Sequence, residues 1–209
     1  MVTFKKYLKE MAYPTNFSFE EFKNIKSYAD KLKYANERLQ KIASGSARVV
    51  YKVDDQKVLK IAKNKKGLAQ NSVESEHYLQ NYDIIARVFE TCNDDFYVEM
   101  ELATKVKPTR FKAITGVNIR DLDNYLRYME RANKGKKQYF HIDPVMKSEL
   151  DNNEFVQDIM SLMSDYDMVA GDYGKLSSYG EVIRNGKPKI VLIDFGLTYA
   201  VYNDFYKVG

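Results

Sequence analysis

Three charged residues stand where they could bind phosphate or a metal ion. Lys60 lies inside the apolar segment VLKIA of residues 58–62, and a cation among residues that face a core needs a reason to be there. Asp172 lies between two glycines in residues 171–174 (GDYG), and Asp194 follows an apolar run and precedes Phe-Gly. An aspartate that projects from a rigid strand is well placed to hold Mg²⁺. These settings point to phosphate chemistry, although Lys60 on a strand could equally alternate outward to solvent.

A glycine turn and two glutamates flank Lys60 along the chain. The turn is ASGSARVV, residues 43–50, and the backbone N–H groups around Gly45 can approach phosphates because no side chain blocks them. An ordinary hairpin is the alternative. Glu74 and Glu76 follow in a helical stretch, residues 70–80, where a carboxylate could hold the lysine in place. We favour Glu74 as the partner and expect at least one of the two glutamates to lie on the surface.

The elements that must position these residues can be read from the sequence pattern. Ser18 is a good N-cap with Glu21 three residues on, so we expect a helix from Ser18 to about Gln40, with Phe17 and Phe22 as a hydrophobic staple. Further helices are expected at residues 71–80, 118–132 and 154–166. Expected strands are residues 47–53, 57–62, 84–89, 96–102, 181–184 and 189–193, with turns at 54–56, 93–95 and Asn185-Gly186. Strand-rich sequence gives way to helix-rich sequence at about residues 103–108.

Length and composition exclude several classes of protein. The 209 residues suit one domain, or one domain built as two small lobes, and 44% hydrophobic with 13% aromatic residues argues against disorder. No apolar run approaches the ~20 residues of a membrane span, and the charged N-terminus lacks the apolar region of a signal peptide. A lone Cys92 excludes a disulfide framework and a cysteine zinc site. We therefore expect a reducing, cytoplasmic setting and no membrane partner.

The net charge of +4 is unevenly spread. Residues 1–66 hold 16 Lys/Arg and 7 Asp/Glu, whereas the rest of the chain holds 17 and 22. A basic part beside an acidic part could bind phosphates. The alternative, which we place first on composition alone, is a solvated lysine-rich surface.

The order of these features resembles the protein-kinase-like fold. That order is glycine loop, strand lysine, helix glutamate, hinge, loop aspartate, hairpin and Asp-Phe-Gly, and it covers roughly residues 40–200. More narrowly, the segments SGSARVVYKV, LKIAKNKKGLAQN and GDYGKLSSYG…VLIDFGLT look like minimal, C-terminally truncated kinase-like proteins of tailed phages and bacteria. The resemblance implies an α+β, two-lobed fold with an antiparallel sheet in the N-lobe. It also implies a small, mostly helical C-lobe that ends shortly after Asp-Phe-Gly. The implied regions are an N-terminal helical extension (1–40), the N-lobe (41–105) and a reduced C-lobe (106–209).

The resemblance also implies ATP and Mg²⁺ between two lobes, with a role for each matched residue. Lys60 would contact the α- and β-phosphates, held by Glu74, and Asp172 would be the base that orients the acceptor hydroxyl. Asp194 and Ser177 would bind the metal. The remaining nucleotide contacts would come from the glycine loop and the adenine hinge, namely Gly45, Ser46, Ala47, Arg48, Val50, Glu101 and Ala103.

Several positions depart from the kinase pattern. Ala43 and Arg48 take the places of two loop glycines, and Arg48 could contact a phosphate or crowd the site. Ala-Gly precedes Asp172 where protein kinases have His-Arg, which is closer to antibiotic and small-molecule kinases. Ser177 replaces the metal-binding asparagine, so a second metal is in doubt. Only 15 residues follow Asp194, which leaves no room for an activation loop or a peptide-binding platform.

Three functions follow as hypotheses. The first is an ATP/Mg²⁺-dependent phosphotransferase, in one form a serine/threonine protein kinase, that transfers the γ-phosphoryl group to a hydroxyl. The second is a catalytically weak pseudokinase that acts as a binding or inhibitory module. The third, nucleic-acid binding through the basic N-terminal part, is disfavoured by the small net charge. The expected partners are a nucleotide and a protein substrate or protein partner, in the host cytoplasm if the protein is phage-encoded.

Overall fold

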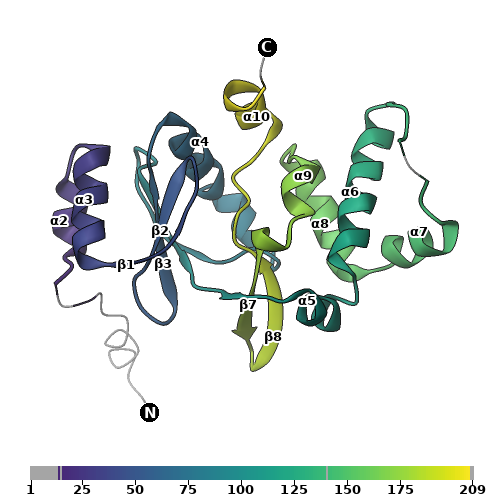
Figure 1. Ribbon diagram of the computed structural model, residues 1–209, viewed down its shortest axis with the longest axis horizontal. Helices are drawn as coiled ribbons and strands as arrows, with labels where there is room; N and C mark the ends of the chain where they lie inside the picture. The colour runs from purple at the N-terminus through teal and green to yellow at the C-terminus, as the bar shows by residue number, and fades with distance from the viewer. Residues whose placement is uncertain (1–13, 15, 140, 208–209) are drawn as a thin grey trace. The chain divides into compact units, whose positions relative to one another are not determined.

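The computed structural model describes residues 14, 16–139 and 141–207 and shows an α+β fold in two compact units (Figure 1). The first unit contains the described residues up to Ser75 together with Arg87–Leu102, and the second contains Glu76–Ala86 and the described residues from Ala103 onward. The predicted α+β class is confirmed, and the elements follow the order expected from the resemblance to a two-lobed protein-kinase-like fold. In the described part of the chain, no helix has the length and apolar character to cross a membrane.

The first unit is built on a five-stranded antiparallel sheet of order β1-β2-β3-β5-β4. Its strands are β1 (Gln40–Ser44), β2 (Arg48–Lys52), β3 (Lys57–Ala62), β4 (Val88–Thr91) and β5 (Tyr97–Glu101). All six residues of the central β3 are buried, so both faces of this strand are covered. In the register of the sheet Lys60 stands opposite Val50 and Val98, which places these three side chains on the same face.

Two short helices, α2 (Phe19–Asn24) and α3 (Tyr28–Arg38), cover the other face of that sheet (Figure 1). Their aromatic and aliphatic side chains form one core with Leu59 and Ile61 of β3. The predicted start of the first helix, with Ser18 as its N-cap, is confirmed. The Glu21 N–H donates to the Ser18 hydroxyl, and the ring centres of Phe17 and Phe22 lie 5.7 Å apart.

The prediction of one helix reaching Gln40 is wrong. Ser27 caps a second helix by accepting from the Asp30 N–H, and Lys31 fills the open end of α2 by donating to the carbonyls of Phe22 and Lys23. The chain then enters β1 at Gln40, a strand whose residues are all exposed and which therefore carries no apolar alternation to predict it.

Two further predictions need correction in this unit. The helix expected at 71–80 is α4 (Lys65–Glu74), which begins six positions earlier than expected because Asn64 caps it by accepting from the Gly67 N–H. A separate 3₁₀ turn, His77–Asn81, follows in the second unit. The strand expected at 84–89 begins only at Val88, because Ile85 instead bridges Leu192 within the second unit.

The second unit combines a three-stranded antiparallel sheet with helices. The sheet has the order β6-β7-β8, and Asn185 (φ 53°) and Gly186 (φ 73°) make the tight turn that the sequence predicts. The expected helices at 118–132 and 154–166 are confirmed as α6 and α8. The elements are β6 (Thr104–Lys105), α5 (Pro108–Thr115), α6 (Ile119–Asn133), α7 (Pro144–Asp151), α8 (Glu154–Asp165), α9 (Ala170–Tyr173), a 3₁₀ turn (Leu176–Ser178), β7 (Tyr179–Arg184), β8 (Lys187–Leu192) and α10 (Tyr199–Phe205).

Candidate active site

Lys60 is a buried member of an ion pair and not an outward-facing strand residue. Its Nζ lies 3.0 Å and 2.9 Å from the two carboxylate oxygens of Glu74, and the two residues are 5% and 0% exposed. The pair joins the centre of β3 to the last turn of α4. Glu76 lies beyond the end of α4, in the other unit, so Glu74 is the glutamate that pairs with Lys60.

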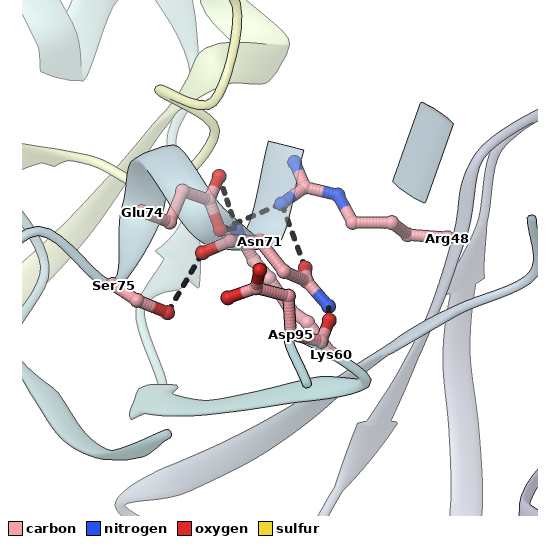
Figure 2. A network of polar contacts seen from close by, with 6 residues as sticks. All are labelled: Arg48, Lys60, Asn71, Glu74, Ser75 and Asp95. Carbon is pink, nitrogen blue, oxygen red and sulfur yellow. Dashed lines mark hydrogen bonds and ion pairs between the residues drawn. The ribbon is translucent and has the colours of Figure 1, made fainter. Parts of the chain in front are cut away.

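Arg48 is a second cation on the same carboxylate (Figure 2). Its Nη1 lies 2.7 Å from Oε2 of Glu74 and donates to Oδ1 of Asn71 at 3.3 Å, and the residue is 8% exposed. Burial alone would raise the pKa of Glu74, but the charges and hydrogen bonds of Arg48 and Lys60 outweigh it and hold that pKa below its ordinary value. Glu74 is therefore an ionised carboxylate that orients two buried cations.

Asn71 ties this network to its surroundings. Its Nδ2 donates to the carbonyl of Asp95 at 2.8 Å, in the turn before β5, and its own carbonyl accepts from the Ser75 hydroxyl at 2.7 Å. Figure 2 shows the Arg48 side chain reaching toward Asn71 and Glu74, both of which belong to α4. Asn71 was not among the predicted site residues, because its only signal in the sequence is a polar residue one turn before Glu74, on the same face of the helix.

The glycine loop is anchored to the start of α4. The Lys63 Nζ donates to the Gly45 carbonyl at 2.8 Å, and the Lys66 Nζ donates to the Ser46 hydroxyl at 2.8 Å. A Cβ on Gly67 would lie 2.3 Å from the Ala47 carbonyl oxygen, so only glycine permits this approach of helix to loop. Around Gly45, by contrast, a Cβ would meet no heavy atom within 4 Å, although the Gly45 N–H itself donates to the Arg48 carbonyl at 2.9 Å.

The two hinge residues of the sequence analysis fall in different units. Glu101 ends β5, where its N–H donates to the Arg87 carbonyl at 2.8 Å and its carboxylate accepts from the Arg87 N–H at 3.1 Å. Ala103 begins the second unit and packs against Gly180 of β7, at which a Cβ would lie 2.4 Å from that of Ala103. Glycine at position 180 is therefore a packing requirement that the sequence pattern did not reveal.

In the second unit the segments of Asp172 and Asp194 are held together by Ser178. The Ser178 hydroxyl donates to the Asp172 carbonyl at 2.6 Å, and the Ser178 carbonyl accepts from the N–H of Ile193, the residue before Asp194, at 2.8 Å. The Asp172 carboxylate pairs with Lys175 at 2.5 Å. Asp194 is exposed at the end of β8. Ser178 thus links the backbone of Asp172 to that of the residue before Asp194, although the two aspartates lie 22 positions apart in the sequence.

The oxygen donors of this unit fit a magnesium ion. Asp194 and Ser177 are both exposed, whereas the hydroxyl of Ser178 is buried and already used. The part of the chain that the structure describes holds no group of three His, Cys, Asp or Glu side chains able to bind a metal. Mg²⁺ is commonly bound by one or two carboxylates plus substrate phosphates, and the Asp194 carboxylate and the Ser177 hydroxyl are oxygen donors of the kind that such a site uses.

The predicted residues therefore form two sets, each within one unit. Lys60, Glu74, Arg48 and Val50 lie together in the first unit with the glycine loop, and Asp172, Ser177 and Asp194 lie in the second. Lys175 and Ser178 were not among the predicted site residues, although both fall in the segment GDYGKLSS, residues 171–178, that contains Asp172 and Ser177.

Comparison with known proteins gives likenesses of fold at low similarity. No family model matches the chain, and no curated protein does. Among solved structures, SAICAR synthase from Saccharomyces cerevisiae is 14% identical over 75% of this chain and 73% of its own, with a TM-score of 0.37. The streptomycin–ATP–APH(2″)-IIa ternary complex is 15% identical over 82% and 71%, with a TM-score of 0.36. ADP-bound aminoglycoside phosphotransferase APH(2″)-Ib is 17% identical over 80% and 70%, with a TM-score of 0.34. Function must be argued from the residues of this chain.

Proposed function

We propose that this chain is an ATP-dependent phosphotransferase that moves the γ-phosphoryl group to a hydroxyl acceptor. The observation that carries the proposal is the buried ion pair between Lys60 and Glu74. A buried lysine held by an ionised carboxylate stays charged and fixed in direction, which is what binding the α- and β-phosphates requires.

The first unit supplies the nucleotide-binding residues in this proposal. Lys60 binds phosphate oxygens, and the loop that contains Gly45 contacts the phosphates through the backbone N–H groups of Ser46 and Ala47. Arg48 holds Glu74 in place through its ion pair. Glu101 of this unit and Ala103 of the second unit provide backbone groups for the adenine.

The second unit supplies the residues for transfer. Asp172 accepts the hydrogen bond of the acceptor hydroxyl and orients it, while Lys175 balances the charge of the Asp172 carboxylate. Asp194 and Ser177 hold Mg²⁺, which when bound neutralises charge on the phosphates. The acceptor to test first is a serine or threonine hydroxyl of a protein, with small-molecule alcohols as a second arm. The cytoplasm, as the compartment that supplies ATP, is the proposed location.

The matched experiment compares two lysines of the same strand. Lys57 is also buried in an ion pair, with Glu99 at 3.1 Å, but it lies on the other face of the sheet. Lys60→Met and Lys57→Met should therefore lower the free energy of unfolding by similar amounts. Only Lys60→Met should lose transfer of label from γ-labelled ATP to casein-type protein and to the chain itself. Equal transfer by the two variants would overturn the phosphate role of Lys60.

A nucleotide-binding module without transfer is the second candidate. The lysine contacts that hold the glycine loop to α4 favour it, because they fix a loop that closes over phosphates in active enzymes. It predicts that ATP raises the melting temperature of the wild-type chain while no label is transferred to any acceptor. Transfer that depends on both Lys60 and Asp194 rules this candidate out.

A further inference from the structure

Glu130 on α6 joins two segments that flank the proposed reacting groups. Its Oε1 accepts from the N–H of Ala170 at 3.0 Å and also accepts from the hydroxyl of Tyr199. Ala170 lies two residues before Asp172, and Tyr199 lies five residues after Asp194. One carboxylate oxygen therefore binds a backbone group on the Asp172 segment and a side chain on the Asp194 segment.

The same two segments also pair along their backbones. The Val169 N–H donates to the Leu197 carbonyl at 3.2 Å, and the Tyr199 N–H donates to the Asp167 carbonyl at 2.9 Å. Met168 and Thr198 form an antiparallel bridge between these bonds. This short ladder ends at Ala170, whose N–H points instead at Glu130. The Glu130 carboxylate thus provides the next link between the two segments, at the point where their backbones no longer form hydrogen bonds with each other.

The face of α6 that carries Glu130 also contacts the two glycines around Asp172. Asp123, Arg127 and Glu130 are spaced four and three residues apart, which places them on one side of the helix. A Cβ on Gly174 would lie 1.9 Å from Oδ1 of Asp123, and one on Gly171 would lie 3.5 Å from a guanidinium nitrogen of Arg127. Asp123 and Arg127 are themselves paired at 2.7 Å. Gly174 therefore lets the loop lie directly on this polar face, whereas a Cβ at Gly171 would make an ordinary van der Waals contact with Arg127.

We propose that Glu130 is a positioning residue for phosphoryl transfer, which fixes the backbone that carries Asp172 relative to the segment that follows Asp194. This role rests on the proposed function. A charged acceptor makes stronger hydrogen bonds than a neutral one, and its loss frees the Ala170 N–H and the Tyr199 hydroxyl together. Displacement of a reacting group by about 1 Å can cost about 100-fold in rate, so the effect should fall on catalysis and not on nucleotide binding.

Three variants test this role. Glu130→Leu removes the acceptor at similar side-chain size, and Glu130→Gln keeps a carbonyl oxygen that can accept both hydrogen bonds. Glu149→Leu is the control, because Glu149 is an exposed glutamate on α7. The measurements are kcat and KM for ATP, together with deuterium uptake of a peptide that spans residues 168–175.

Glu130→Leu should lower kcat by about 10- to 100-fold with KM for ATP unchanged within twofold, and Glu130→Gln should recover most of that loss. Deuterium uptake at residues 168–175 should rise in Glu130→Leu alone. An unchanged kcat, an equal defect in the Gln and Leu variants, or unchanged uptake would overturn the positioning role while leaving the proposed function intact. A wild-type chain that transfers no phosphate would overturn both.

Discussion

Lys60 on β3 and Glu74 on α4 form a two-oxygen ion pair inside the first unit, with Nζ 3.0 Å and 2.9 Å from the carboxylate oxygens. The pair fixes helix to sheet at the residue that the proposed function needs for phosphate binding. Because Arg48 shares the same carboxylate, removal of Glu74 affects two buried cations at once. Glu74 therefore contributes both to the stability of the first unit and to the position of the lysine that the proposed function requires.

Replacing Glu74 by Gln should lower the free energy of unfolding by about 3 kcal/mol, because breaking a buried ion pair leaves its partners uncompensated. Urea denaturation at pH 7 measures this loss. Glu76→Gln is the matched control, since Glu76 lies outside α4, and it should change stability by less than about 0.5 kcal/mol. Equal stability of the two variants would show that the network contributes nothing to the fold.

The same carboxylate predicts a pH dependence. The pKa of Glu74 in the folded chain lies below its ordinary value of 4.5, so its stabilisation is fully present above that value and is lost as the pH falls toward the folded pKa. Urea titrations of wild type and Glu74→Gln at pH 7, 5, 4 and 3 should show a constant stability difference at pH 7 and 5. The difference should narrow at pH 4 and 3. A difference that widens on acidification would contradict the depressed pKa.

A feature of this site can be predicted from the sequence only where the residues that determine it are close together along the chain. The strand of Lys60 and the Asn185-Gly186 turn were predictable because neighbouring residues carry the pattern. The limits of α4 were not, since KKGLAQNSVE has little apolar periodicity and its helix is stabilised by Asn64 and by contact with β3. Glu130 gave no signal at all, because its partner N–H at Ala170 is 40 residues away and forms only in the folded chain.

The break between α2 and α3 is one such tertiary effect, and it can be tested at Lys31. This lysine is 2% exposed, donates to two carbonyls at the end of α2, and its Nζ lies 4.7 Å from the ring centre of Phe22. Lys31→Met should cost about 2 kcal/mol of stability in urea, because hydrogen bonds from charged donors are worth about 1.5–3 kcal/mol. Lys33→Met, at an exposed position of the same helix, should cost almost nothing. A Lys31→Met protein as stable as the Lys33 variant would refute this cap.

Replacement by alanine should change the stability of the chain at Gly67 but not at Gly45. Gly67→Ala puts a Cβ 2.3 Å from the Ala47 carbonyl oxygen, so it should destabilise the chain although alanine favours a helix by about 1 kcal/mol. Gly45→Ala meets open space and should leave the melting temperature unchanged within about 2 °C. It should nevertheless weaken nucleotide binding, because the new methyl group occupies space that the proposed phosphates approach. Thermal melting with and without ADP separates the two effects, and a stable Gly67→Ala protein would contradict the close contact.

Asp194 should control the response to magnesium without controlling the fold. It is exposed at the end of β8, so Asp194→Asn should melt within about 2 °C of wild type in the absence of ligand. In wild type, Mg²⁺ added with ATP should raise the melting temperature beyond the effect of ATP alone, because the ion binds the carboxylate and the phosphates together. Asp194→Asn should keep the increment due to ATP alone, which depends on Lys60, and lose the increment due to Mg²⁺.

Asp121→Asn, a charge-matched change in the first turn of α6, should keep both increments. A full magnesium increment in Asp194→Asn would remove Asp194 from the proposed metal site.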